Sequence, residues 1–205
     1  SNVQKWGYDP QGGTPWNEIF QVKPGHFLYK GTEYPYWDWS SVPATNLYDD
    51  LSLAVKLRLG GFRDAAVLLS GGLDSTIIHQ LVKEQGLDIT AIHVDNGEKS
   101  YAEQICNDLV HVTLDDVTDE DAVRIHQTPV DLGSVKPQIA MARKLKELGF
   151  HNVLTGDGAD ELFGGYKRAA EYDSQMSDIF CELPYYHLPK LDRTMMRSTV
   201  ELRAP

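Results

Sequence analysis

Several short segments of the chain are apolar throughout their length, and segments with one apolar face separate them. A continuous apolar segment of about four to eight residues is typical of a strand buried on both faces, whereas apolar residues at about every third or fourth position indicate an amphipathic helix. The predicted strands are Ala65–Leu69, Ile89–Val94, Val110–Leu114 and Asn152–Thr155; the predicted helices are Leu47–Leu59, Ser75–Gln85, Lys99–Leu109, Asp119–His126 and Val135–Leu148. Strands of this kind, one helix apart, predict an α/β fold with a parallel sheet and helices on both faces.

Residues 1–43 differ from the rest, because they are rich in glycine, proline and aromatic side chains. Between Ile19 and Tyr29 the pattern predicts two short strands around a turn at Lys23-Pro24-Gly25-His26. This segment is too short to bury its own rings, so we expect it to pack on a main domain formed by residues 44–205. Its dense aromatic side chains favour self-association into a homo-oligomer, and base stacking is a lesser alternative.

Composition narrows the class of protein. Among 205 residues, 41% are hydrophobic and 24% charged, as in a soluble globular protein. Thirty acidic against nineteen basic residues give a net charge of −11, which argues against nucleic acid as the main ligand. No apolar stretch approaches the roughly 18 residues of a membrane span, and no signal-peptide pattern is present, so we expect no membrane partner.

Two cysteines, Cys106 and Cys181, are too few for a disulfide framework or a zinc site. Cys106 falls in an apolar helical stripe and is expected to be a core residue. We therefore expect a reducing, cytoplasmic setting.

The strongest chemical signal follows the first predicted strand, where Ser70-Gly71-Gly72-Leu73-Asp74-Ser75 leads directly into a helix. The glycines allow an anion to approach the backbone, and the N–H groups at the helix start, with two serine hydroxyls, can hold a phosphate. The Asp74 carboxylate would repel a phosphate unless a divalent cation lay between them, so it predicts Mg²⁺. An ordinary strand–turn–helix corner with a capping aspartate is the simpler alternative.

A second signal follows the last predicted strand. Asp157, Asp160 and Glu161 lie within five residues of one another, between glycines. A metal ion with a bound triphosphate would compensate their mutual repulsion, and an acidic helix N-terminus is the alternative. Because the carboxyl ends of parallel strands meet at one edge of a sheet, we expect one cleft formed by Leu69-Ser70, Val94-Asp95 and Leu154-Thr155-Gly156.

These motifs resemble those of the asparagine synthetase family. S-G-G-L-D-S is similar to the pyrophosphate-binding loop of ATP pyrophosphatases, and G-D-G-A-D-E-L-F-G-G-Y, L-P-K-L-D-R and V-E-L-R-A-P follow in that family's order, so the likeness covers residues from about Thr14 to Pro205. The resemblance implies an adenine-nucleotide alpha-hydrolase-like fold. It also implies that the β-carboxylate of aspartate attacks the α-phosphorus of ATP, giving β-aspartyl-AMP and pyrophosphate, and that ammonia then displaces AMP.

The resemblance further implies roles for single residues. It assigns pyrophosphate binding to Ser70, Gly71, Gly72, Leu73 and Ser75; Mg²⁺ binding to Asp74 and Asp160; the adenosine site to Leu68, Val94 and Gly156; catalysis to Asp74, Asp157, Asp160 and Glu161; and the acceptor carboxylate to Ser134, Lys136 and Gln138. Asp157 stands where the family usually has glutamate, one methylene longer.

Two departures from the family shape the expected function. The sequence has no N-terminal glutaminase domain, so ammonia must come free or from a separate glutaminase or second chain. The basic segment that neutralises pyrophosphate is also missing, and Lys99, Lys167 or Arg168 are candidates to replace it.

Three functions stay open. The first is an ammonia-dependent asparagine synthetase, or a relative that adenylates another small carboxylate; Val94-Asp95-Asn96-Gly97, which looks closer to GMP synthetase, allows a different substrate. The second is a non-catalytic nucleotide-binding remnant, and the third is a tRNA-modifying pyrophosphatase.

Overall fold

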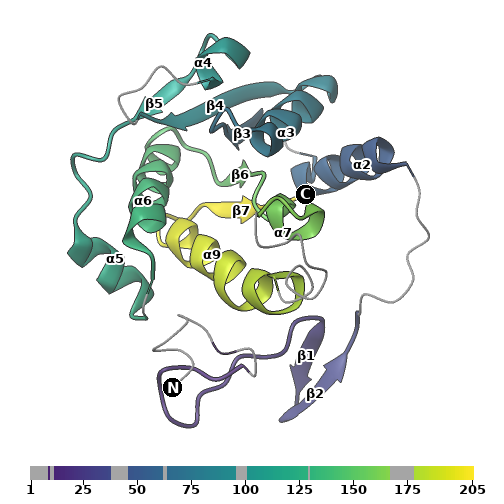
Figure 1. The fold of residues 1–205 in the computed structure, drawn as a ribbon, viewed down its shortest axis with the longest axis vertical. Coiled ribbons are helices and arrows are strands. Elements are labelled where there is room, and N and C mark those ends of the chain that lie inside the picture. Colours follow the sequence, from purple (N-terminus) through teal and green to yellow (C-terminus); the bar gives the residue numbers. More distant parts are fainter. Residues whose placement is uncertain are drawn as a thin grey trace.

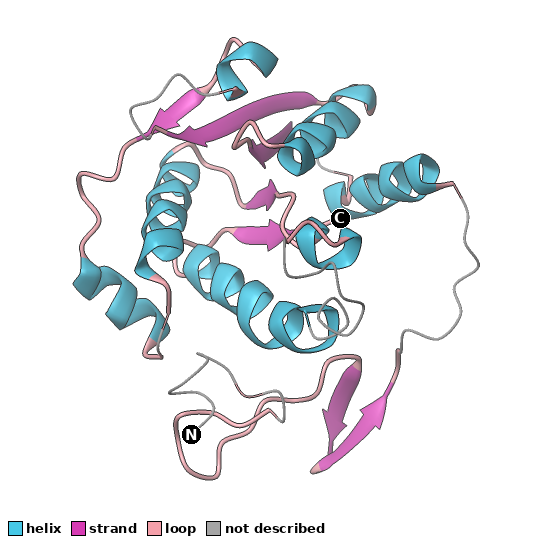
Figure 2. Ribbon diagram, in the orientation of Figure 1, coloured by secondary structure: helices cyan, strands magenta, loops and turns pink. Residues whose placement is uncertain are grey.

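A computed structural model describes residues 9, 12–37, 46–61, 64–95, 101–128, 130–166 and 178–205. Within these residues the centre is a five-stranded parallel sheet, shown in Figures 1 and 2, formed by β3 (Asp64–Leu68), β4 (Asp88–Val94), β5 (Val110–Val112), β6 (Asn152–Leu154) and β7 (Glu201–Arg203). The strand order is β5-β4-β3-β6-β7, so the chain builds outward from β3 and then crosses back to β6. The predicted α/β fold with a parallel sheet is confirmed, and the order reverses between β3 and β6, where such sheets bind ligands.

Helices cover both faces of this sheet (Figure 1). One face carries α2 (Leu47–Leu59) and α3 (Leu73–Glu84), and the other carries α5 (Asp119–His126), α6 (Leu132–Glu147) and α9 (Leu188–Met196). Successive side chains of β3 point to opposite faces of the sheet. Val67 packs in the core on the side of α2 and α3, and Leu68 packs in the core on the side of α5, α6 and α9. β3 is therefore buried on both sides, which is why Ala65–Leu69 is a continuous apolar segment.

Helix starts follow local capping. The Asn46 side chain accepts hydrogen bonds from the N–H groups of Tyr48 and Asp49 at the start of α2, and Gly60, in the left-handed conformation, ends that helix. Asp131 caps α6, which therefore begins three residues before its predicted start. The helix α3 begins two residues earlier than predicted, directly after Gly72.

The N-terminal strands are placed differently from the prediction. They are β1 (His26–Tyr29) and β2 (Thr32–Pro35), an antiparallel hairpin that turns at Lys30-Gly31, so the predicted turn at Lys23–His26 is wrong as the hairpin connection. Lys30 and Gly31 have φ values of 48° and 81°, and a two-residue turn of this kind matches the twist of the paired strands. The Pro24-Gly25 turn instead precedes β1.

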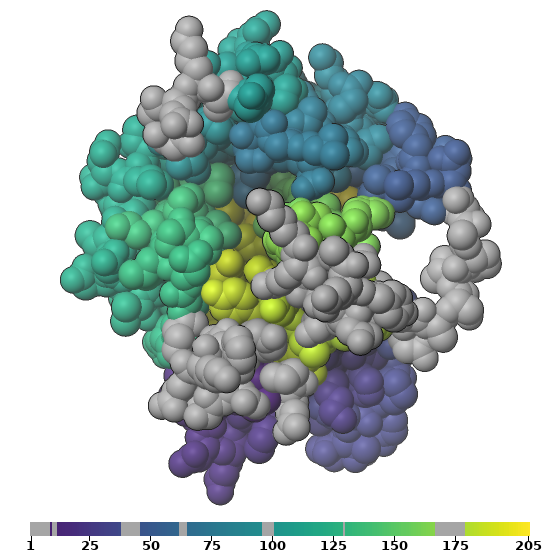
Figure 3. Space-filling model, in the orientation of Figure 1, coloured from purple at the N-terminus to yellow at the C-terminus, as the bar shows by residue number. Residues whose placement is uncertain are grey.

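The N-terminal segment leaves many of its rings in solvent. Phe20, before the hairpin, and Tyr36, directly after it, are 74% and 70% exposed. In the space-filling view the purple N-terminal residues lie beside the yellow residues of α9 (Figure 3), and Trp16 and Arg193 line a small cavity at this contact. The predicted domain boundary at residues 43 and 44 lies outside the described residues.

The predicted helix Lys99–Leu109 is too long. The helix α4 covers only Ala102–Ile105, because Cys106 is extended and Asn107-Asp108, which favour turns, follow it. Cys106 is half-buried and packs against the buried cluster of Leu69, Ala91 and Ala102, so it lies at the edge of the core and in an extended conformation, not in the predicted helical stripe. Lys99 itself lies outside the described residues.

Four further elements complete the described chain: α7 (Ala159–Phe163), a π-helical segment (Asp178–His187), α9 and β7. None of them was among the predicted elements. In the described part of the chain, every helix is too short or too polar to cross a membrane.

Candidate active site

The carboxyl ends of β3, β4 and β6 open into one cavity of about 530 Å³, a size suited to a small-molecule ligand. The three predicted strand ends therefore meet, as expected from the parallel sheet. Of the predicted site residues, those lining the cavity are Leu68, Ser70, Gly72, Asp74, Ser75, Val94, Gly156, Asp157, Asp160 and Glu161. Gly71 and Leu73 do not line it.

The glycine loop is held by hydrogen bonds within itself. Ser75 Oγ accepts from the Ser70 N–H at 3.2 Å and donates to the Gly72 carbonyl at 3.2 Å, and Ser70 Oγ accepts from the Gly72 N–H. Among the described residues, no side chain caps the N–H groups at the start of α3. Uncapped N–H groups at a helix start, beside a cavity, favour an anionic ligand.

Gly71 and Leu73 have different surroundings. A Cβ atom at Gly71, whose φ is 86°, would lie 2.6 Å from the main-chain nitrogen of Ala102, so this glycine lets α4 pack against the loop. The Leu73 side chain is 74% exposed and lines an apolar groove with Leu47, Ile77 and Phe163. A pyrophosphate role for Leu73 can therefore come only from its main chain.

Four carboxylates gather at one end of the cavity. Partial burial, followed by the charges of Asp160 and Glu161, raises the pKa of Asp74. Glu161 is buried and accepts a hydrogen bond from the Tyr166 hydroxyl at 2.7 Å. The two predicted loops thus lie close enough for their charges to act on each other.

Asp157 lies on the same wall. Solvent reaches its side chain, but the concave surroundings exclude enough water to raise its pKa, against a hydrogen bond donated by the Thr155 hydroxyl that lowers it. The ammonium of Lys190 also lowers the pKa of Asp157. Asp157 is therefore within electrostatic reach of the Lys190 ammonium.

Lys190 and His187 are site residues that the sequence reasoning missed. Lys190 is 8% exposed, donates from Nζ to Ser134 Oγ at 3.1 Å, and has its pKa lowered by burial. His187 Nε2 lies 3.6 Å from both Glu161 and Glu182 carboxylate oxygens. Lys190 lies four residues before Thr194, so both side chains lie on the same, buried face of the helix. This spacing was the available signal for Lys190.

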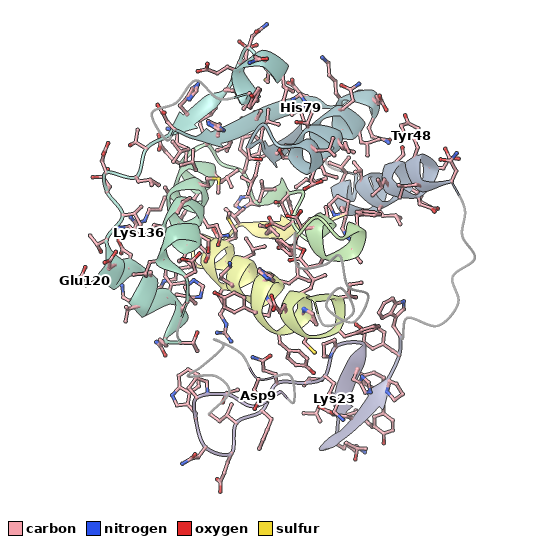
Figure 4. All side chains as sticks on the ribbon, viewed as in Figure 1. Asp9, Lys23, Tyr48, His79, Glu120 and Lys136 are labelled. Carbon is pink, nitrogen blue, oxygen red and sulfur yellow. The ribbon has the colours of Figure 1, made fainter. Side chains whose placement is uncertain are left out.

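The three residues predicted to bind the acceptor carboxylate do not all lie at the cavity. Ser134 and Gln138 line the cavity. Lys136 lies at the outer side of α6 near α5, where Figure 4 labels it, and its Nζ is 3.0 Å from an Asp119 carboxylate oxygen. Lys167 and Arg168, two of the candidates for neutralising pyrophosphate, lie outside the described residues, as Lys99 does.

The donor set fits a magnesium ion that a nucleotide brings with it. In the described residues no three His, Cys, Asp or Glu side chains form a metal site by themselves. Mg²⁺ is usually held by one or two carboxylates together with phosphate oxygens and water. Asp74 and Asp160, whose negative charges repel each other, are the carboxylates that match this arrangement.

The comparisons with known proteins agree with this geometry. The asparagine synthase family model matches residues 46–182. The chain is 32% identical to asparagine synthetase [glutamine-hydrolyzing] 1 of Arabidopsis thaliana over 70% of its own length and 30% of that protein's, and 27% identical to asparagine synthetase B [glutamine-hydrolyzing] of Escherichia coli K12 over 96% and 41%. It thus spans well under half the length of these curated relatives. The chain belongs to the asparagine synthase family.

Proposed function

We propose that this chain is an ATP-dependent carbon–nitrogen ligase that adenylates the β-carboxylate of aspartate and transfers the activated acyl group to ammonia. One observation carries the proposal: Asp74 of the glycine loop shares one cavity with Asp160 and Glu161 of the acidic loop, and the charges of these two residues contribute to raising the pKa of Asp74. Family membership supports the use of ATP, and the relatives' printed names support asparagine as the product.

The chain's own residues supply binding and orientation in this scheme. The uncapped N–H groups at the start of α3 hold the β- and γ-phosphates, and Asp74 with Asp160 holds Mg²⁺. When bound, Mg²⁺ neutralises charge that develops on the leaving pyrophosphate. An aspartate oxygen then bonds to the α-phosphorus as the bond to pyrophosphate breaks.

The second step joins nitrogen to carbon. Ammonia attacks the acyl carbon, the carbon–oxygen bond to AMP breaks, and the nitrogen loses a proton. Asp157, fixed by Thr155 and close to Lys190, is the carboxylate that we assign to accept that proton. Ammonia, free or delivered by a separate glutaminase, is the proposed amine.

Pyrophosphate and asparagine formation from Mg-ATP, aspartate and ammonium tests the proposal. We expect turnover that falls about 100-fold or more in Asp74→Asn, because the variant loses one of two metal carboxylates. Asp88→Asn is the matched control, since Asp88 is exposed at the opposite end of β4. Absence of both products with the wild-type protein, under conditions where it binds ATP, would overturn the ligase assignment.

One observation favours a second candidate, a nucleotide-binding protein without turnover. Among the described residues, no lysine or arginine lines the cavity, and its only basic side chains are His93 and His187. Pyrophosphate would then lack a neutralising cation from this part of the chain. Calorimetry that shows Mg-ATP binding, together with no release of pyrophosphate from ATP in the presence of any small carboxylate, would select this candidate.

The described cavity lining contains neither cysteine, which weighs against a tRNA-modifying enzyme that uses a catalytic cysteine.

A further inference from the structure

A second, smaller cavity lies where the N-terminal segment, residues 12–37, contacts the main domain. Its volume is about 30 Å³, enough for about one or two particles the size of a water molecule. Trp16 and Gln21 line it from the N-terminal segment, and Thr128, Tyr185 and Arg193 line it from the main domain. A ligand held here would therefore touch both parts of the chain.

The described lining of this small cavity is basic. It contains His126, Lys190 and Arg193 but no aspartate or glutamate, although the chain has thirty acidic residues. The charge of Lys190 is balanced by nearby carboxylates, Asp157 among them. Arg193 has no such balance, because in the described chain no ion pair or hydrogen bond joins its guanidinium to another residue.

The effect of these charges is evident at His126. Burial, and after it the positive charges of Arg193 and Lys190, lowers the pKa of His126 to about 4, so its ring is neutral at pH 7. Among the described residues, no carboxylate acts on this ring against the two cations. The surroundings of the small cavity are therefore electropositive, in a chain whose net charge is −11.

The small cavity also offers hydrogen-bond donors. In the described chain the hydroxyl groups of Thr128 and Tyr185 have no hydrogen-bond partner, and both side chains are half-buried. Burial above all raises the pKa of Tyr185, so its hydroxyl keeps its proton and can donate. The acids near this tyrosine, Glu33 and Asp9, lie outside the cavity lining.

The three groups together favour an anion over water. A guanidinium can only donate hydrogen bonds, so a ligand beside Arg193 has to accept them. A water molecule would satisfy the two hydroxyl groups but would leave the charge of Arg193 unpaired. An anion would satisfy the hydroxyl groups and pair the charge, and hydrogen bonds between charged partners are the stronger ones.

We propose that a small inorganic anion of the size of chloride binds in this cavity, accepting hydrogen bonds from the Arg193 guanidinium and from the hydroxyl groups of Thr128 and Tyr185. The anion joins the N-terminal segment to the main domain, because Trp16 and Gln21 line the cavity from the other side. The site is separate from the candidate active site and does not depend on the proposed use of ATP.

Bromide is the probe for the position of the anion, because it replaces chloride and scatters X-rays anomalously. Crystals of the wild-type protein soaked in sodium bromide should show an anomalous peak between Arg193 and Thr128. Crystals of Arg193→Gln soaked in the same way should show no peak there. Water density without an anomalous signal in the wild-type cavity would overturn the inference.

Thermal midpoints test the same site in solution. The wild type should unfold about 2–4 °C higher in sodium chloride than in sodium gluconate of equal ionic strength, because gluconate is too bulky for the cavity. This difference should disappear in Arg193→Gln and fall by about half in Thr128→Val, which loses one of three donors. If Arg193→Gln does not fold, Thr128→Val decides.

Arg197→Gln is the matched control, because Arg197 ends α9, is exposed and lies outside the lining of the small cavity. It should keep the full difference between the two salts. The same difference in the wild type, the control and both cavity variants would be a general salt effect and would overturn the inference. None of these outcomes affects the ligase assignment, which is tested by product formation.

Discussion

Gly156 lies directly against Asp74: a Cβ atom on Gly156 would be 2.9 Å from both the main-chain carbon and the Cβ of Asp74, and 2.9 Å from the Ser75 nitrogen. Real Cβ atoms do not approach backbone atoms this closely, so the absence of a side chain is what lets the two loops meet. The adenosine role predicted for Gly156 remains a prediction, whereas its packing role follows from these distances.

Gly156→Ala should therefore separate the two loops. We expect a loss of stability of about 1–3 kcal/mol, because overpacking forces the backbone to move. Mg-ATP affinity should fall further than this variant's stability explains. Urea unfolding and calorimetry measure the two effects. Gly133→Ala is the control: its added Cβ would meet only an Asp131 carboxylate oxygen at 3.3 Å, so both values should stay close to wild type. Wild-type ATP affinity in Gly156→Ala would contradict the packing role.

Removal of one cavity carboxylate should change how the protein responds to magnesium. Mg²⁺ held by Asp74, Asp160 and the phosphates of ATP would stabilise the folded state through linkage, so with ATP present Mg²⁺ should raise the thermal midpoint of the wild type. The rise should disappear in Asp160→Asn, while the midpoint without metal stays equal or increases because repulsion is relieved. Differential scanning fluorimetry with Mg²⁺ or EDTA measures both. An equal rise in Asp88→Asn is expected, and an equal rise in Asp160→Asn would exclude this metal site.

His126 should make stability depend on pH below neutrality. Its ring is buried and its Nε2 donates to Thr194 Oγ1 at 3.0 Å, because that hydroxyl already donates to the Lys190 carbonyl. Burial, then the charges of Arg193 and Lys190, lowers the pKa of His126 from 6.5 to about 4. Below pH 6.5 the unfolded chain binds a proton that the folded chain excludes, so stability falls as pH falls.

This effect should reach about 2 kcal/mol at pH 5 and end near pH 4. Urea unfolding at pH 7.5 and pH 5 measures it. His126→Gln keeps a donor for Thr194 and should lose that part of the pH dependence. The exposed His151→Gln should retain it. If the free energy of unfolding changed with pH equally in the wild type and in His126→Gln, the folded protein would not keep His126 neutral, and the prediction would be wrong.

Asp121 should also make stability fall as pH falls, but over a lower pH range than His126. It completes the capping box of α5 with Thr118 and lies 2.9 Å from both Arg124 and Arg143. The Thr118 N–H, then Arg143, holds the pKa of Asp121 well below its ordinary value of 3.8. Its contribution is therefore present above about pH 4 and is lost as pH falls further.

Asp121→Ala should lower the thermal midpoint at pH 7 and shift acid unfolding to higher pH. Arg143→Ala removes one of two cations and should have a smaller effect. Asp115→Asn, at an exposed turn residue, is the control and should change neither value. An Asp121→Ala midpoint equal to that of the control would contradict the capping role.

The strands and most helices were predictable because their signals are local. Ala65–Leu69 is apolar through its length, and Ile89–Val94 is interrupted only by Thr90 and His93; the structure places both as interior strands of the sheet. β7 was missed because three residues with two charges carry no strand pattern, and their partner, β6, is far away in the sequence. The hairpin was misplaced because Pro24-Gly25 is the more familiar turn signal, although Lys30-Gly31 makes the connection.

The site was predictable to the extent that contiguous motifs form it. The two loops meet because the ends of parallel strands share an edge, which sequence order already implies. Lys190 and His187 come from elements whose facing sides depend on tertiary packing. No pattern within a single segment indicates that Lys190 lies near Asp157.

The pairing of β6 has a consequence for synthesis of the protein. β6 lies between β3 and β7, and the Thr155 N–H donates to the Arg203 carbonyl at 3.2 Å, which fixes the start of the acidic loop. Chains grow from the N-terminus at about 5–20 residues per second, so the glycine loop leaves the ribosome seconds before β7 does. A nascent chain that has not yet released residue 203 therefore carries the glycine loop before the acidic loop has the hydrogen bond that fixes its start.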